Sequence, residues 1–486
     1  MKVKTPRSPL AVLALATALA GCNLAPKYER PASAAPAMLP SGGIYPRAAT
    51  DAPDVTAIGW RDFFLDPRLR QVIETGLANN RDLRIAAGNV LQARAQYRVR
   101  RADQVPNTGL NGSGTFTNNV FGATGGGAGG GVGAGAGAGA TSSNIEIYSA
   151  NLGFSAFELD LFGRVRNLSR AALEQYFASE EAQRAARISL IAEIATAWLT
   201  MAADQEQLRI SRETLKTLEQ TLELTRAQFR IGVASELAAR QAEAQYQSAR
   251  NDIATLETQV ARDQNALNLL AGTTIPAEQL PTELGTTPVT LDALPGNLSS
   301  EVLLRRPDVL QAEHQLIAEN ANIGAARAAF FPQISLTAAI GTISTALSGL
   351  FGGGSFTYSA SPGVALPLFD GGRNAANLDY AKASQQVAVA SYERAIQTAF
   401  REVSDALAQR GTIGEQIAAQ SARAEAAQVA ARLSEARYRA GVDSFLVSLD
   451  AQRTAYAAQQ ALVTTRLARA NNLIELYRSL GGGLAP

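Results

Sequence analysis

Residues able to do covalent or metal chemistry are scarce in this 486-residue sequence. It has one histidine, His314, and one cysteine, Cys22. His314 falls within an expected helix, has no predicted partner, and is interpreted as a plain helical residue. No His-Cys-carboxylate cluster indicates a metal site, and no Ser-His-Asp set indicates a nucleophile. The glycine-rich run 125–140 lacks the Gly-Lys-Ser/Thr of a phosphate-binding loop. The sequence therefore predicts no enzyme, no cofactor and no metal.

Cys22 directly follows a segment with the layout of a signal peptide. Three basic residues within the first seven positions precede an apolar run from Leu10 to Ala20, which is too short to cross a bilayer. The string Leu19-Ala20-Gly21-Cys22 resembles the bacterial lipobox, in which a cysteine thiol receives a diacylglycerol. We expect residues 1–21 to be removed and Cys22 to be lipidated; a chance cysteine beside a signal sequence is the alternative. By the same resemblance, Asn23 in place of aspartate favours the outer membrane.

The charges of the chain are balanced. The 44 Lys+Arg residues against 43 Asp+Glu residues give a formal net charge of +1. This balance provides no basic field of the kind that nucleic-acid binding needs, so nucleic acid is excluded as a partner. A composition of 46% hydrophobic and 18% charged residues is ordinary for a folded protein.

The chain contains two copies of one unit, an internal two-fold sequence repeat. Residues 80–110 align with 306–336 at an offset of 226, and later segments align at an offset of 209. The later pairs are Phe229–Ser235 with Tyr438–Ser444, and Leu267–Gly272 with Leu476–Gly481. The change of offset predicts a 17-residue insertion in the first copy, with the glycine-rich run as its source.

The repeat predicts the order of domains. They are a signal peptide (1–21), an N-terminal lipid-anchored extended segment (22–64), a first repeat (65–272), an equatorial linker (273–300), a second repeat (301–481) and a C-terminal tail (482–486). Each repeat is expected to hold a helix, a strand pair, one long helix and a further helix. The last three are expected at 108–158, 164–231 and 234–271 in the first repeat, and at 333–368, 373–440 and 443–480 in the second.

Two segments suit very long helices. Residues 164–230 contain no glycine or proline, and 67 residues would reach ~100 Å as a helix. Residues 373–440 lack proline, but Gly411 and Gly414 predict a local break or bend. Charges at every turn exclude membrane-spanning helices, and recurring alanine and serine favour close packing of neighbouring helices. An ordinary coiled-coil dimer is the alternative that periodicity leaves open.

The four strand segments alternate in polarity. In 333–341, Ile334, Leu336 and Ile340 share one face, and Ser335 and Thr337 share the other. Small uncharged polar residues on one face and apolar residues on the other are typical of a β-barrel with lipid outside and water inside. A soluble half-buried sheet is the alternative. Because bacterial barrels begin at eight strands, we expect a cyclic homo-oligomer.

Five sequence motifs remain to be accounted for. They are Phe157–Arg164, Arg305–Asp308, Ala365–Arg373, Tyr438–Ser444 and Leu449–Arg453. As a set they resemble the outer membrane factor family, the TolC-like and nodulation-type efflux lipoproteins, over nearly the whole mature chain. The resemblance implies a mostly helical α+β membrane protein: a homotrimer with a twelve-stranded outer-membrane β-barrel, four strands per chain, continued by a twelve-helix periplasmic α-barrel. The implied partners are outer-membrane lipid, a periplasmic adaptor (membrane fusion protein) and an inner-membrane pump.

The resemblance also implies two adaptor-facing helix tips. They fall on Gly232, Val233 and Ser235 in the first repeat and on Gly441, Val442 and Ser444 in the second. From the residues alone, the same positions are helix punctuation, in which a left-handed glycine is followed by an N-capping serine or aspartate. Both interpretations can hold together.

The family's periplasmic gate falls on Leu446, Asp450 and Arg453. Around a three-fold axis, three Asp450 carboxylates would form a ring that attracts cations, while Leu446 would narrow the bore. From the residues alone, an i,i+3 surface ion pair between Asp450 and Arg453 is the alternative. The matching residues of the first repeat are Gln241 and Ala244, so we expect only the second hairpin to line the bore.

The leading hypothesis is an outer-membrane channel that passively conducts small molecules, such as drugs and toxic compounds, from an inner-membrane pump and adaptor to the exterior. A type I protein-secretion duct is one alternative. A non-conducting periplasmic coiled-coil lipoprotein is another, although it would not need four strands of two-faced polarity.

Overall fold

The computed structural model describes residues 23–46, 58–117, 145–285, 289–291 and 299–482. Cys22, the signal peptide and the glycine-rich run lie outside this range. The chain divides into two compact units. The first comprises Met1–Pro31, Leu91–Ala178 and Glu313–Ser391, and the second comprises Ala32–Val90, Ser179–Ala312 and Tyr392–Pro486.

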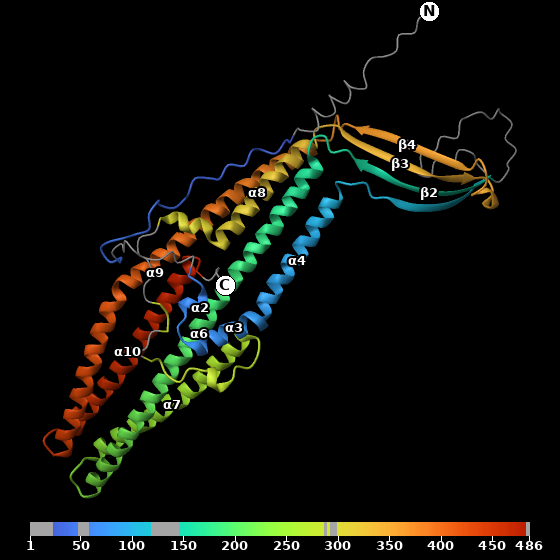
Figure 1. Cartoon of the computed structure of the whole chain (residues 1–486). Coiled ribbons are helices and arrows are strands. Elements are labelled where there is room, and N and C mark those ends of the chain that lie inside the picture. The colour runs from blue at the N-terminus through green and yellow to red at the C-terminus, as the bar shows by residue number, and fades with distance from the viewer. Residues whose placement is uncertain (1–22, 47–57, 118–144, 286–288, 292–298, 483–486) are drawn as a thin grey trace, which may run out of the picture. The chain divides into compact units, whose positions relative to one another are not determined.

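The first unit contains a four-stranded antiparallel sheet (Figure 1). Its strands are β1 (Gly109–Thr117), β2 (Ile145–Glu158), β3 (Gln333–Ser344) and β4 (Phe356–Ala365), in the spatial order β1-β2-β3-β4. Strands β1 and β4 are therefore its edges. Because the number of strands is even, these two edge strands run in opposite directions.

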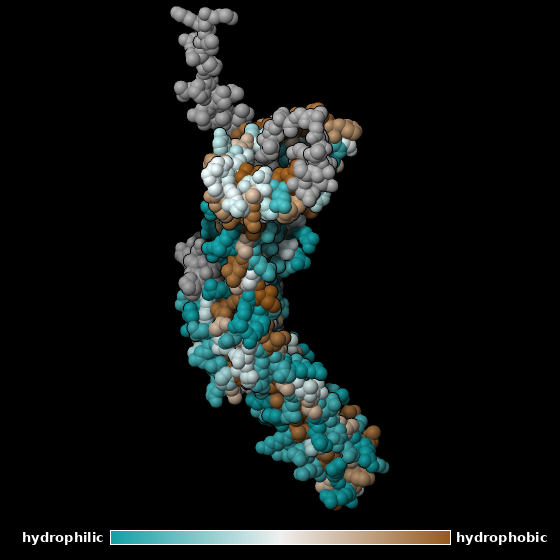
Figure 2. All heavy atoms as spheres, turned by 90° about the vertical axis from the view of Figure 1, so that its right-hand side faces the viewer, coloured by the Kyte–Doolittle hydropathy of each residue, from teal (hydrophilic) through white to brown (hydrophobic). Residues whose placement is uncertain are grey.

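The strand register gathers apolar side chains into rows on one face of the sheet. One row consists of Leu110, Leu152, Ile340 and Tyr358, each paired with the next. The neighbouring row, on the other face, consists of Asn111, Asn151, Gly341 and Thr357. All four side chains of the apolar row are at least half exposed. Figure 2 shows white to brown spheres over the sheet, whereas the helices are largely teal. The described residues of the chain do not cover this apolar row.

Strand β2 departs from the expected alternation near its end. The pairing with β3 shifts between Phe154 and Phe157, which marks a β-bulge. Ala156 inside the bulge has a φ of 51°, and its amide donates to the Thr337 hydroxyl at 3.0 Å. The bulge changes the direction of the side chains that precede the following helix.

Helices make up most of the rest of the described chain. They are α2 (Trp60–Phe63), α3 (Pro67–Asn79), α4 (Arg81–Ala102), α6 (Arg164–Arg230), α7 (Glu236–Ala271), α8 (Pro307–Ala328), α9 (Arg373–Arg439) and α10 (Phe445–Ser479). Short 3-10 helices occupy Ala277–Gln279, Ser300–Arg305 and Leu347–Gly349. The two longest helices, α6 and α9, have 67 residues each. An 18-residue stretch of α6 is apolar enough to cross a membrane, but 56% of it is buried within the protein.

The core of the second unit contains several aromatic side chains among many aliphatic ones. Phe63 of α2 stacks on Tyr477 of α10 with ring centroids 3.9 Å apart. Trp198 of α6 is also buried, and its indole donates to the Gln279 carbonyl at 3.1 Å. Arg306 lies buried beside this core and donates to the Ser479 carbonyl at 2.7 Å and to Glu402 at 2.8 Å. The stacking of Phe63 on Tyr477 connects α2 to α10.

Helix α9 continues through Gly411 and Gly414, so, of the break or bend expected there, the break is wrong. The two glycines differ in their surroundings. A Cβ at Gly411 would collide with the carbonyl group of Ile44, whereas a Cβ at Gly414 would meet nothing within 4 Å. Gly411 thus allows the N-terminal segment to lie against the helix. Its role is close backbone approach.

The first residues of the described chain are fastened to the first unit. Asn167 near the start of α6 donates its amide to Asn23 Oδ1 at 2.9 Å, and Ala25 packs at Gly324 of α8. Arg30 forms a 2.7 Å ion pair with the buried Glu313. Residues 23–30 thus pack against α6 and α8.

His314 has a partner, which corrects the expectation for this residue. Its Nδ1 lies 2.8 Å from the Glu174 carboxylate of α6, and its ring lies beside Phe177. Helix α8 therefore contacts α6 through a polar pair that sequence spacing could not foresee, because the two residues are 140 positions apart.

Candidate functional site: the helix tips and the exposed face of the second hairpin

Two helical hairpins of the second unit end in turns of the same design. Gly232, after α6, has a φ of 81°, and Gly441, after α9, has a φ of 73°. The amide after each glycine reaches back to the helix: Val233 donates to Gln228 and Val442 donates to Arg437, both at 2.9 Å. Both glycines thus adopt the left-handed conformation that the sequence predicts for a helix end.

The two turns differ in how the next helix begins. Ser235 accepts a hydrogen bond from the Ala238 amide at 3.2 Å and caps α7. Ser444 is the N-cap residue of α10, but its side chain makes no capping hydrogen bond. Arg437 instead holds Asp443 through two hydrogen bonds of 2.7 and 2.9 Å. This hydrogen bonding, together with the charge of Arg437, lowers the pKa of Asp443.

Both tips present apolar side chains to solvent. Val233 is 72% exposed and Val442 is 63% exposed. Ile231 and Leu237 are also exposed beside the first turn. Clustered exposed apolar residues on rigid turns are typical of protein contact surfaces.

Helix α10 has two distinct faces near its start. Leu446, Asp450 and Arg453 are exposed, whereas Phe445 and Leu449 are buried. The buried pair packs with Leu222, Ala242 and Tyr438. Within the described residues, no ion pair joins Asp450 to Arg453, so the i,i+3 pair that sequence allowed does not form. The three predicted gate residues thus share one solvent-facing surface of this chain.

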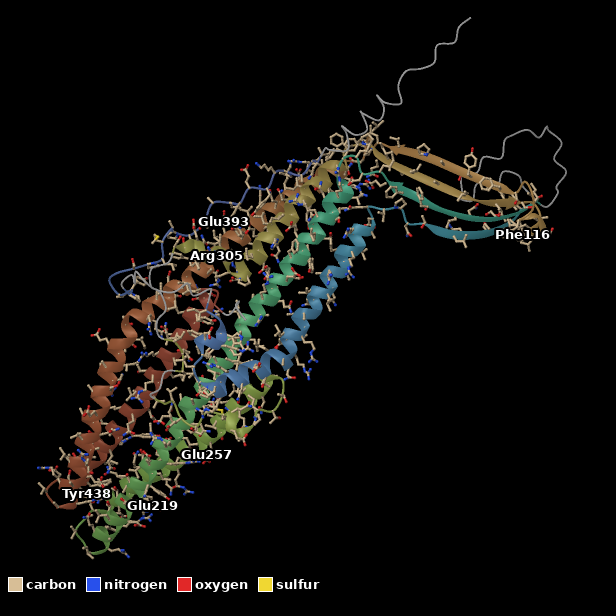
Figure 3. The ribbon with its side chains drawn as sticks, in the orientation of Figure 1. Phe116, Glu219, Glu257, Arg305, Glu393 and Tyr438 are labelled. Atoms are coloured by element: carbon tan, nitrogen blue, oxygen red, sulfur yellow. The ribbon has the colours of Figure 1, made fainter. Side chains whose placement is uncertain are left out.

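Polar contacts between the two hairpins escaped the sequence reasoning. Tyr438, labelled in Figure 3 near the end of α9, donates to Gln228 of α6 at 2.7 Å and lies 3.1 Å from the Thr225 hydroxyl. Tyr456 of α10 lies 2.8 Å from the Ser211 hydroxyl of α6. Tyrosines within otherwise small-residue helices were the only available signal, and their partners are more than 200 residues away.

The described residues hold no group of three or more His, Cys, Asp or Glu side chains placed to bind a metal ion. The features with functional geometry are therefore surfaces: the exposed apolar face of the sheet, the apolar tips and the exposed face of α10.

Comparison with known proteins gives these surfaces a context. The profile of the family described as "Outer membrane efflux protein" matches residues 72–273 and 298–482. The chain is 46% identical over 484 residues to the toluene efflux pump outer membrane protein TtgC of Pseudomonas putida, covering 98% of this chain and 96% of TtgC. It is 41% identical to the cation efflux system protein CusC of Escherichia coli, covering 96% and 98%.

The fold agrees with solved structures of such channels. The open state of the Neisseria gonorrhoeae MtrE outer membrane channel has a TM-score of 0.83 at 38% identity, covering 96% of this chain and 99% of that one. The mostly helical fold with one four-stranded sheet is that of these channels. The chain therefore belongs to the outer membrane efflux protein family, and it is the outer-membrane channel component of a tripartite efflux system.

Proposed function

We propose that this chain forms a homotrimer whose three sheets close one twelve-stranded barrel in the outer membrane, continued by a twelve-helix periplasmic barrel. The observation that carries the proposal is the sheet itself. Its apolar row of Leu110, Leu152, Ile340 and Tyr358 is exposed. Its edge strands β1 and β4 run in opposite directions. A ring of copies can therefore pair each β4 with the next β1 and leave no free edge. Two copies would give eight strands and a lumen filled by side chains, whereas three leave room for a passage.

The cargo is proposed to be small molecules. The names of the relatives refer to toluene and to cations, which are small solutes. The polar row on the opposite face of the sheet, which contains Asn111, Asn151 and Thr357, would line the water-filled lumen. Such a lumen needs no specific binding site, so the inner-membrane pump would select the cargo.

The partners follow from the efflux role, which requires a periplasmic adaptor and an inner-membrane pump. We assign adaptor contact to the two tips, Gly232-Val233 with Ser235 and Gly441-Val442 with Ser444. Their exposed apolar side chains and rigid left-handed turns support this assignment. The gate is assigned to Leu446, Asp450 and Arg453, because all three are exposed on one face of α10 among the described residues.

Lipidation of Cys22 completes the proposal. The lipobox-like sequence supports it, and the fastening of Asn23 to α6 would keep the anchor close to the first unit. Mass spectrometry of the purified protein should show a diacylglycerol and an amide-linked acyl chain on Cys22. The Cys22→Ser variant should lack both.

Reconstitution into planar bilayers tests the channel directly. The wild-type protein should conduct ions in discrete steps, and its gene should restore solvent or drug tolerance to a strain that lacks its own efflux channel but keeps the pump and adaptor. A protein that inserts as a trimer yet neither conducts nor restores tolerance would overturn the small-molecule channel. Secretion of a protein substrate by the complemented strain would favour the duct for proteins.

A further inference from the structure

A buried carboxyl group, Asp263, and a half-buried one, Asp204, lie on the two helices of the first hairpin. Asp263 of α7 is 8% exposed, and its Oδ1 accepts a hydrogen bond from Gln259 at 2.9 Å. Its Oδ2 is buried and receives no hydrogen bond from any described donor. A buried carboxylate oxygen without a donor is costly, because it loses its water without replacement.

The group in contact with Asp263 is the carboxyl of Asp204 on α6. Burial, and after it the hydrogen bond and the charge of Asp263, together raise the pKa of Asp204 to about 7. Two ionised carboxylates have no hydrogen to share, so a hydrogen bond between them requires a proton on one. A shared proton would also supply the donor that Asp263 Oδ2 lacks.

No described cation compensates the pair. Along the same helices, Arg209 pairs with Glu206 and Glu213, Arg212 pairs with Glu257, and Arg262, which precedes Asp263 on α7, is exposed. On the α10 side, Tyr456 bonds Ser211 and lies 3.4 Å from Asp252. None of these groups contributes to the raised pKa of Asp204, whose causes are burial and Asp263.

The second hairpin has neutral residues at the matching positions. The residues 209 places further on are Ile413 and Asn472, and both are buried. Asn472 supplies its own donor, because its amide reaches the Ala406 carbonyl at 2.8 Å. The same place in a hairpin is therefore compatible with a neutral side chain, and the titratable pair is specific to the first hairpin.

We propose that Asp204 and Asp263 form a proton-binding site that fastens α6 to α7 and loosens when the shared proton leaves. This site is independent of the channel's cargo. Its pKa in the folded chain lies above the value of 3.8 expected when unfolded. The stabilisation is therefore complete below pH 3.8 and is lost as pH rises to about 7, where the two carboxylates begin to repel. The contact between α6 and α7 would therefore be most stable at acidic pH.

The test uses the full-length channel in nanodiscs. Infrared difference spectra should show a protonated carboxyl band that titrates near neutral pH and disappears in Asp204→Asn and in Asp263→Asn. Between pH 5 and pH 8.5, the thermal midpoint of the wild type should fall further than that of either variant. At pH 8.5, the Asp263→Asn variant should be more stable than the wild type. Glu219→Gln, an exposed neutralisation on α6 (labelled in Figure 3), is the control and should follow the wild type.

Two results would overturn the proposal. One is an infrared spectrum in which no titrating carboxyl band depends on Asp204 or Asp263, which is independent of how well either variant folds. The other is a thermal midpoint that Mg²⁺ or Ca²⁺ raises at pH 8.5 in the wild type but not in Asp204→Asn, because the ligand would then be a divalent cation and not a proton.

Discussion

At the scale of single residues, the buried Arg306 forms two ion pairs. Its side chain is 6% exposed and lies 2.7 Å from Asp308 and 2.8 Å from Glu402. We expect Arg306→Gln to lower the free energy of unfolding by about 1–3 kcal/mol, because the Ser479 carbonyl would lose its buried donor and Glu402 would keep only Arg478, 3.5 Å away. Urea denaturation followed by circular dichroism measures this change. Arg432→Gln, which makes the same change on an exposed arginine of α9, should alter stability little.

Asp450 offers a second test at this scale. If three Asp450 carboxylates ring the bore as proposed, Asp450→Asn should reduce the preference for cations over anions several-fold, because the ring loses its negative charge. Reversal potentials across a salt gradient in planar bilayers measure this preference. Glu219→Gln removes one charge elsewhere in the hairpins and should leave the preference unchanged; an equal loss in both variants would argue against Asp450 as a bore residue.

At the scale of elements, Gly411 and Gly414 of α9 provide a matched pair. Alanine in place of an interior helix glycine normally stabilises by about 0.5–1 kcal/mol. We expect that gain for Gly414→Ala, which has open space. Gly411→Ala should instead destabilise by about 1–3 kcal/mol, because its methyl group would displace the segment at Ile44. Denaturation midpoints give both signs, and limited proteolysis should cleave residues 32–46 faster in Gly411→Ala alone.

The same helix shows what sequence could and could not supply. The long helices were expected at 164–231 and 373–440, and the structure has them at Arg164–Arg230 and Arg373–Arg439, because an absence of proline and a run of helix formers are local properties. The role of Gly411 depends on Ile44, more than 360 residues away, and could not be inferred locally. The partners of His314, Tyr438 and Asp263 escaped prediction for the same reason: each lies on another helix. Exposure at Leu446 and Asp450 likewise became known only once Phe445 and Leu449 were seen to be buried.

At the scale of the whole molecule, closure of the barrel predicts contact between β4 of one copy and β1 of the next. Cys22 is the only native cysteine, so a Cys22→Ser background is free of competing thiols. In it, Ser113→Cys should be combined in turn with Thr357→Cys, Ser359→Cys or Ser361→Cys. We expect one combination to yield a disulfide-linked trimer on oxidation, because directly opposite residues of antiparallel neighbouring strands have Cα atoms within about 5.5 Å of each other.

Denaturing electrophoresis without reductant measures the cross-linking. The Ser113→Cys variant alone should stay monomeric under these conditions, since its thiols would lie on separate strands of a symmetric ring. A linked dimer as the largest product in all three combinations would contradict three-fold closure.

The hold of Asn167 on Asn23 has a consequence for how deeply the protein sits in the membrane. Asn23 is the residue immediately after Cys22, and its amide oxygen is fixed 2.9 Å from a side chain near the start of α6. A diacylglycerol on Cys22 would therefore be attached one residue away from a fixed point of the first unit. Its glycerol could not move along the bilayer normal independently of the first unit. The lipid would therefore fix the depth at which the sheet is inserted relative to the headgroups.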